Sequence, residues 1–117
     1  MGDSIRERVE RGAALLDKHN PDWYMAVSLQ GLRMSSCSEC VLGQLYGDYG
    51  AGLDKVMPGR RLDTGDYGFM LTPEQLKEFA GWANETGRTA AWDELRSEWT
   101  RAIVIRRENR GKDQPVV

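Results

Sequence analysis

The clearest fold signal of this 117-residue chain is residues 92–107, WDELRSEWTRAIVIRR. Its apolar residues recur at intervals of three and four, which is the repeat of one face of an α-helix. They are Trp92, Leu95, Trp99, Ala102 and Ile103. The pattern predicts a C-terminal helix that is capped at Thr89 and turns Trp92 and Trp99 toward the core. Beyond it, the polar residues 109–117 are expected to form a frayed tail.

A second helix is predicted near the N-terminus. Ser4 and Glu7 have the capping-box spacing, in which each side chain satisfies a backbone N–H of the other residue. Apolar residues then follow at helical spacing, namely Ile5, Val9, Ala13 and Leu16. Pro21 is expected to end the helix, because a proline pushes the residue before it out of the α region.

The next segment predicts a short turn and then another helix. Residues 22–36 are expected to form a turn and an extended connection that places apolar side chains in the core. Ser36 and Glu39 repeat the capping-box spacing just before an apolar run. This helix is therefore expected to begin at about Cys37.

The same predicted helix contains several glycines, which affect its packing and its continuity. Gly43 and Gly47 lie four residues apart, so they clear one stripe of side chains and allow another backbone to come close. Gly50 and Gly52 are expected to break or kink the helix, and Pro58 is expected to end the apolar run that follows.

Residues 58–71 are loop-like, with Tyr67 and Phe69 in either a short strand or an inward-turned loop. A fourth helix is predicted from a Thr72 cap to a stop at Gly87. The expected fold is mainly α: a small bundle of about four helices with irregular connections, forming one domain over residues 1–108.

Composition limits the possible classes of protein. Hydrophobic residues make up 40% and charged residues 29% of the chain, which is the balance of a globular domain and excludes long disorder. No apolar run reaches the ~18 residues that a membrane span needs, and the charged N-terminus lacks the apolar core of a signal peptide. We therefore expect a cytoplasmic protein without a membrane partner. A net charge of −2 makes nucleic acid an unlikely partner, although the C-terminal helix is locally basic.

One run is unusual enough to suggest relatives. It is CSECVLGQLYGDYGAG, residues 37–52, preceded by PDW at residues 21–23 and followed by YGF at residues 67–69. Over residues 5–107 the chain resembles a group of small hypothetical proteins encoded by phages and prophages of actinobacteria. The resemblance implies a phage accessory protein that acts inside a bacterial cytoplasm, and it implies no activity, cofactor or catalytic residue.

Cys37 and Cys40 are the one group of residues whose types and spacing suggest a redox or metal site. At the start of a helix, residues three apart share a face, and the exposed N–H groups favour a thiolate. This arrangement suits thiol–disulfide exchange or half of a zinc site, although Glu39 opposes the thiolate. Packing of two ordinary semi-buried cysteines explains the pair as well.

A zinc site needs further ligands. The single histidine, His19, would have to join the two cysteines together with Asp17 or Asp22, or a homodimer would have to share one zinc between two cysteine pairs. His19 is otherwise explained as a basic residue at a helix end. No catalytic set is complete, so we expect a protein that is not an enzyme and needs no cofactor, with zinc as the alternative.

Aromatic and basic residues supply candidates for partner binding, because large aromatics and arginines dominate protein interfaces. The set comprises Trp82, Tyr67, Phe69, Arg60, Arg61, Arg106 and Arg107. The leading hypothesis is a non-enzymatic module that binds a host or phage protein. The alternatives are a zinc or thiol-redox protein centred on the cysteines, and a weak nucleic-acid binder that uses the C-terminal helix.

Overall fold

The computed structural model describes residues 4–34, 36–59, 65, 67–70 and 85–113. The described part is mainly helical, as predicted, and contains no strand. Its helices are α1 (Ile5–His19), α2 (Trp23–Ala26), α3 (Val41–Tyr46), α4 (Tyr49–Val56) and α6 (Glu85–Asp113). Most of the helix predicted between Thr72 and Gly87 lies outside the described residues.

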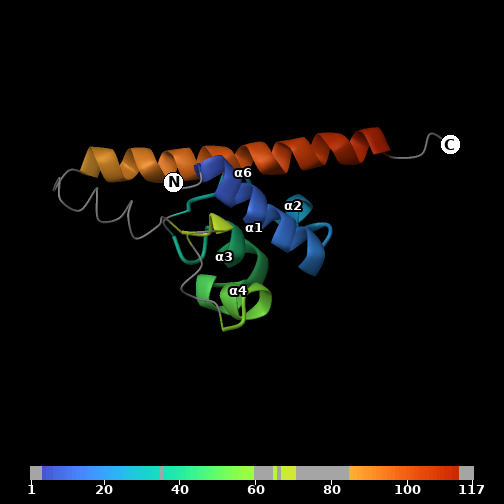
Figure 1. The fold of residues 1–117 in the computed structure, drawn as a ribbon, viewed down its shortest axis with the longest axis horizontal. Helices are drawn as coiled ribbons and strands as arrows, with labels where there is room; N and C mark the ends of the chain where they lie inside the picture. Colours follow the sequence, from blue (N-terminus) through green and yellow to red (C-terminus); the bar gives the residue numbers. More distant parts are fainter. Residues whose placement is uncertain (1–3, 35, 60–64, 66, 71–84, 114–117) are drawn as a thin grey trace.

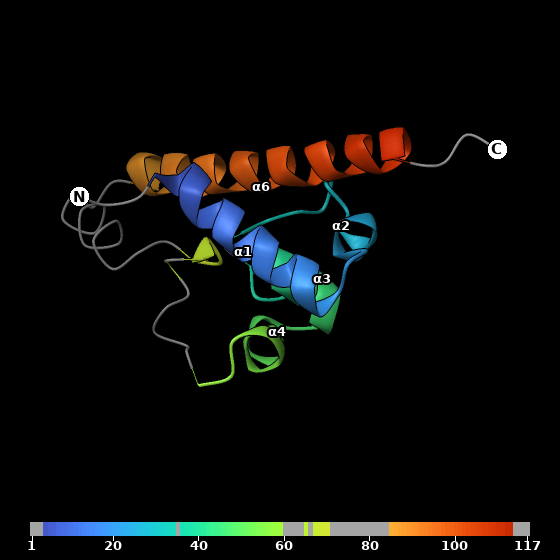
Figure 2. The same ribbon diagram turned by 45° about the vertical axis from the view of Figure 1, so that its right-hand side comes forward.

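The long helix α6 lies along one side of the molecule, and the shorter helices pack beneath it (Figure 1). Helix α1 crosses α6, and α2 also contacts α6 (Figures 1 and 2). Helices α3 and α4 pair with each other on the side away from α6. Within the described residues, every helix is too short or too polar to cross a bilayer.

Helix α1 follows its sequence signals closely. The Ser4 hydroxyl oxygen accepts the N–H of Glu7 at 3.1 Å, and this hydroxyl donates to the Glu7 carboxylate at 3.2 Å. The apolar face predicted for this helix is buried, with Val9, Ala13 and Leu16 almost fully covered. The helix ends at His19, just before Pro21, as predicted. Local spacing was sufficient here because cap and apolar face lie within a few residues of one another.

The start of α3 corrects the sequence prediction. The Ser36 hydroxyl does cap a backbone segment, since it accepts the N–H groups of Ser38 and Glu39, but that segment is a turn and the helix begins four residues late, at Val41. The Cys37 carbonyl, which would accept an intrahelical N–H in the predicted helix, instead accepts the N–H of Tyr49 at 2.8 Å. A contact with α4 therefore sets the start of α3.

The glycines also act differently from the prediction. Gly43 permits the expected close approach, because a Cβ there would lie 2.4 Å from the Cys37 carbonyl oxygen. Gly47, by contrast, has a φ of +94° and ends α3, with nothing packed against it. The break therefore falls at Gly47 rather than at Gly50 or Gly52, which both lie inside α4.

Helix α6 is longer than predicted at both ends. Its first turns pass through Gly87 and Thr89, so the predicted stop and cap there are wrong. A single glycine costs a helix only about 1 kcal/mol, which a long packed helix tolerates. At the other end the helix passes the expected limit of residue 108 and continues to Asp113. Residues 114–117 of the predicted tail lie outside the described residues.

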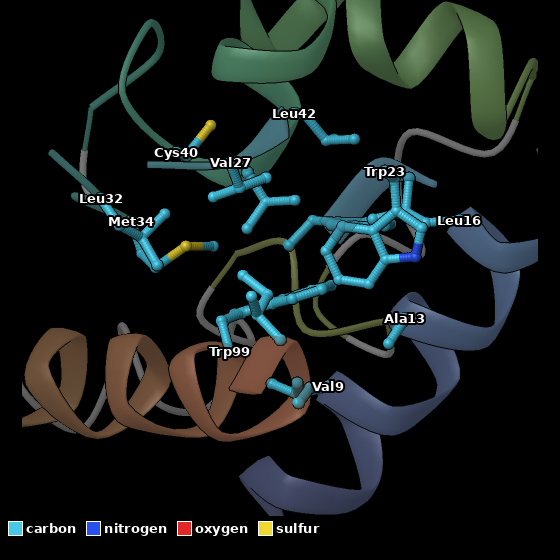
Figure 3. Close-up of a cluster of buried hydrophobic side chains, with 14 of the residues drawn as sticks. Val9, Ala13, Leu16, Trp23, Val27, Leu32, Met34, Cys40, Leu42 and Trp99 are labelled. Carbon is cyan, nitrogen blue, oxygen red and sulfur yellow. The ribbon is translucent and has the colours of Figure 1, made fainter. Parts of the chain in front are cut away.

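Trp99 is the centre of the core, as its position on the periodic face predicts. Its ring meets Trp23 edge-on at 5.8 Å and stacks on Phe69 at 5.5 Å between ring centres. Its indole N–H donates to the Gly68 carbonyl at 2.6 Å, so the buried polar atom is satisfied. Figure 3 shows Trp99 reaching from α6 into side chains from α1 and the connection after α2. Trp92 is only half-buried at the edge of this core.

Candidate functional site

The residues predicted to bind zinc do not form a group of three ligands. Cys40 is buried, whereas Cys37 and His19 are exposed, and among the described residues no three His, Cys, Asp or Glu side chains are grouped as a metal site requires. Asp17 instead accepts bonds from Arg106 and from the Trp23 indole, and Asp22 pairs with Arg110. The carboxylates considered as further ligands therefore serve the fold.

The two cysteines differ in their surroundings. Cys40 is the N-cap of α3 rather than a residue of its first turn, and its sulfur accepts the N–H of Gly43 at 3.3 Å. Burial raises the pKa of the Cys40 thiol despite that bond, so the fold favours the thiol over the expected thiolate at this residue. Both cysteines nevertheless line one small cavity of about 80 Å³, whose wall includes Phe69 and Trp92.

The predicted partner-binding residues are mostly engaged within the chain. Arg106 donates to Asp17 at 2.9 Å and lies over the Trp23 ring, and Arg107 donates to the carbonyl oxygens of Tyr24 and Val27 at 3.0 and 2.6 Å. These contacts attach the C-terminal half of α6 to α1 and α2. The two arginines therefore help to hold the fold together, and their role as partner contacts stays a prediction.

The described aromatic candidates, Phe69 and Tyr67, pack against the core. Phe69 is buried against Trp99, and Tyr67 is half-buried in the inward-turned loop, which is the second of the two predicted alternatives. The positive φ of Gly68, +72°, produces this turn and brings its backbone against Val9. Trp82, Arg60 and Arg61 lie outside the described residues.

The structure adds a site that the sequence analysis missed, around Arg96. Its guanidinium donates to the carbonyl oxygens of Leu32 at 2.8 Å and Leu29 at 3.2 Å, which ties α6 to the connection after α2. Figure 2 shows this connection running beside α6. The sequence did contain a signal, because Arg96 lies one helical turn after Trp92 and so flanks the apolar face.

Two adjoining depressions meet at Arg96, and we call them together the Arg96 groove. The larger, of about 430 Å³, lies between residues 30–34 and the side chains of Trp92, Asp93 and Arg96. The smaller, of about 370 Å³, continues along α6 past Arg96 to Ser97 and Thr100. Both are lined by Gln30 as well. The groove therefore follows α6 from Trp92 to Thr100.

The two arginines of the Arg96 groove differ in whether a described carboxylate pairs with them. Arg96 is exposed and bonds to neutral carbonyl oxygens, and none of the described carboxylates forms an ion pair with it. Arg33, on the opposite wall, is 3.6 Å from Glu39. The carbonyl bonds hold the Arg96 guanidinium in place without neutralising it. A fixed positive charge beside an aromatic wall can bind a carboxylate together with an apolar group.

Neither family models, curated proteins nor solved structures give a match to this chain. A functional argument for it therefore rests on its own residues, and the Arg96 groove combines volume with a fixed guanidinium that no described carboxylate pairs.

Proposed function

We propose that this chain is a small non-enzymatic module that binds another protein, and that it is an accessory protein of an actinobacterial phage or prophage. Its partner would be a host or phage protein in the bacterial cytoplasm. The observation that supports binding is the Arg96 groove, which offers an open surface with an aromatic wall and a fixed guanidinium. The phage setting rests on the resemblance over residues 5–107 alone. Aromatic residues and arginines are the residue types that contribute most to protein interfaces.

A matched pair of variants tests the proposal. Ser97→Glu places a carboxylate beside Arg96 from an exposed position of the groove, and Ala14→Glu adds the same charge at an exposed position of α1. Immobilised wild-type chain and Ala14→Glu are expected to retain the same stoichiometric protein from an actinobacterial lysate. Ser97→Glu is expected to lose it. If the wild type retains nothing above an unrelated bait, the binding proposal is wrong.

A thiol-redox or zinc role is the second candidate, and the cavity shared by Cys37 and Cys40 favours it. Native mass spectrometry of protein purified without chelator separates these chemistries. A zinc-sized mass excess would support metal, and a loss of two mass units after treatment with oxidised glutathione would support a disulfide. An unchanged mass with two free thiols would remove both.

Binding of nucleic acid by the C-terminal helix has less support. Arg106, Arg107 and Arg110 all contact other parts of the chain, which leaves them poorly placed for phosphate. We expect no shift of duplex DNA at low salt, where such binding is strongest.

A further inference from the structure

We infer that the partner of the Arg96 groove is a short extended peptide segment with one carboxylate side chain and an apolar residue on the side of that carboxylate that faces Trp92. This inference rests on the proposed function and specifies the chemistry of the partner. It follows from the length of the groove, the position of its charge and the aromatic wall that Trp92 forms at one end.

The length favours a peptide. Trp92 and Thr100 are eight residues apart on a helix that rises about 1.5 Å per residue, so the groove follows α6 for roughly 12 Å. An extended chain covers that distance with about four residues. A small anion would occupy only the centre of such a groove and leave both depressions empty.

The position of the charge sets the register of that segment. Arg96 lines both depressions, so a carboxylate bound to it would lie where they meet. Because the Leu29 and Leu32 carbonyls already fix the guanidinium, little side-chain entropy would be lost when the carboxylate binds. Charge-assisted bonds of this kind are also among the stronger ones in proteins.

Trp92 selects one neighbour of the carboxylate. It is half-buried and gives its end of the groove an aromatic wall, whereas Leu32 and Met34 at that end are buried. The other end carries Leu29 beside its polar side chains, so it accepts either kind of residue. The expected segment therefore has an apolar residue on the Trp92 side of a single acidic residue.

Selection from a displayed library of random heptapeptides tests this inference on the full chain. Peptides retained by the wild type and by Ala14→Glu, but not by Ser97→Glu, are expected to share one aspartate or glutamate next to an apolar residue. Replacing that acid by its amide in the best synthetic peptide is expected to weaken binding about tenfold or more. Raising the salt concentration should weaken it further.

Three results of the selection would overturn the inference: no peptide enriched above background, enriched peptides without an acidic residue, or peptides bound equally by Ser97→Glu. Competition by inorganic phosphate at concentrations near those of the peptide would also overturn it, because a simple anion site would then be sufficient. The lysate experiment tests the proposed function independently of the peptide selection. A protein retained from lysate by both wild type and Ser97→Glu would leave a binding module whose contact surface is elsewhere.

Discussion

Asp17 joins three elements through one side chain. It accepts bonds from the Trp23 indole at 2.8 Å and from the Arg106 guanidinium at 2.9 Å, so it links α1 to α2 and α6. Burial raises the pKa of the Asp17 carboxyl, but the bonds from Arg106 and Trp23 and the positive charge of Arg106 outweigh it, so the pKa lies below its ordinary value. The charged form is therefore favoured by folding.

Asp17→Asn is expected to reduce stability in a pH-dependent way. A lowered pKa in the folded state contributes stability above the ordinary carboxyl pKa and loses it as the pH falls through the lowered value. The difference from wild type should be at most about 1 kcal/mol at pH 7, because the pair is partly exposed, and should shrink below about pH 4. Urea denaturation of the variant and the wild type, at pH 7 and below about pH 4, measures this difference in stability. Glu10→Gln, at the more exposed pair with Arg101, is the control and should change little.

The cysteines provide a second matched pair of single-residue changes. Cys40→Ala removes a buried cap, and we expect a loss of about 1–2 kcal/mol in the free energy of unfolding. Cys37→Ala removes an exposed side chain and should change this free energy by less than about 0.5 kcal/mol. Equal effects of the two substitutions on chemical denaturation would contradict the assignment of Cys40 as the cap.

Two glycines of α4 show how an element depends on its neighbour. A Cβ at Gly52 would lie 2.7 Å from the Leu42 Cβ on α3, whereas a Cβ at Gly50 would meet only the Asp48 carboxylate at an ordinary 3.7 Å. Gly52 is therefore required for the close packing of α3 on α4. Gly50 serves no such contact and only weakens its helix.

These two positions should respond in opposite directions to alanine. Gly52→Ala is expected to destabilise the protein by about 1–3 kcal/mol through overpacking. Gly50→Ala is expected to stabilise it by about 0.5–1 kcal/mol through better helix propensity. Thermal unfolding followed by circular dichroism compares them directly. A loss of stability in both variants would show that α4 does not pack as described.

Across the whole molecule, arginines hold α6 to the rest of the chain. Arg96 and Arg107 both donate to backbone carbonyls of residues 24–32, and Arg106 and Arg110 pair with acidic residues near α2. The apolar face of α6 packs the middle of the helix into the core, and these polar contacts extend its attachment toward the C-terminus. They account for a helix that continues past the predicted end.

Arg107→Ala is expected to loosen the C-terminal part of α6. It removes two bonds from a charged donor, which corresponds to a loss of about 1–2 kcal/mol. Relative to the wild type, the variant should show a larger increase of the hydrogen-exchange rate in residues 104–113 than in α1, as measured by mass spectrometry. Arg101→Ala removes only an exposed ion pair with Glu10, so it controls for helix propensity and should leave the exchange rates nearly unchanged.

Local sequence was enough to predict α1, the buried face of α6 and the mainly helical class. Each of these depends on residues three or four apart, such as Ser4 with Glu7 or Leu95 with Trp99, and a helix brings such residues together whatever surrounds it. After the short helix α2, which the predicted turn did not include, the apolar anchors of the predicted connection are confirmed, since Val27, Leu32 and Met34 are buried.

Contacts between distant residues fixed the remaining features. The start of α3 depends on a bond between Cys37 and Tyr49, and the roles of Arg96 and Arg107 depend on carbonyl oxygens 64 to 83 residues earlier in the chain. A backbone carbonyl has no residue-specific signature in a sequence, so an arginine that binds one cannot be told from an arginine free for a partner. The Arg96 groove exists only because folding places the connection after α2 beside α6.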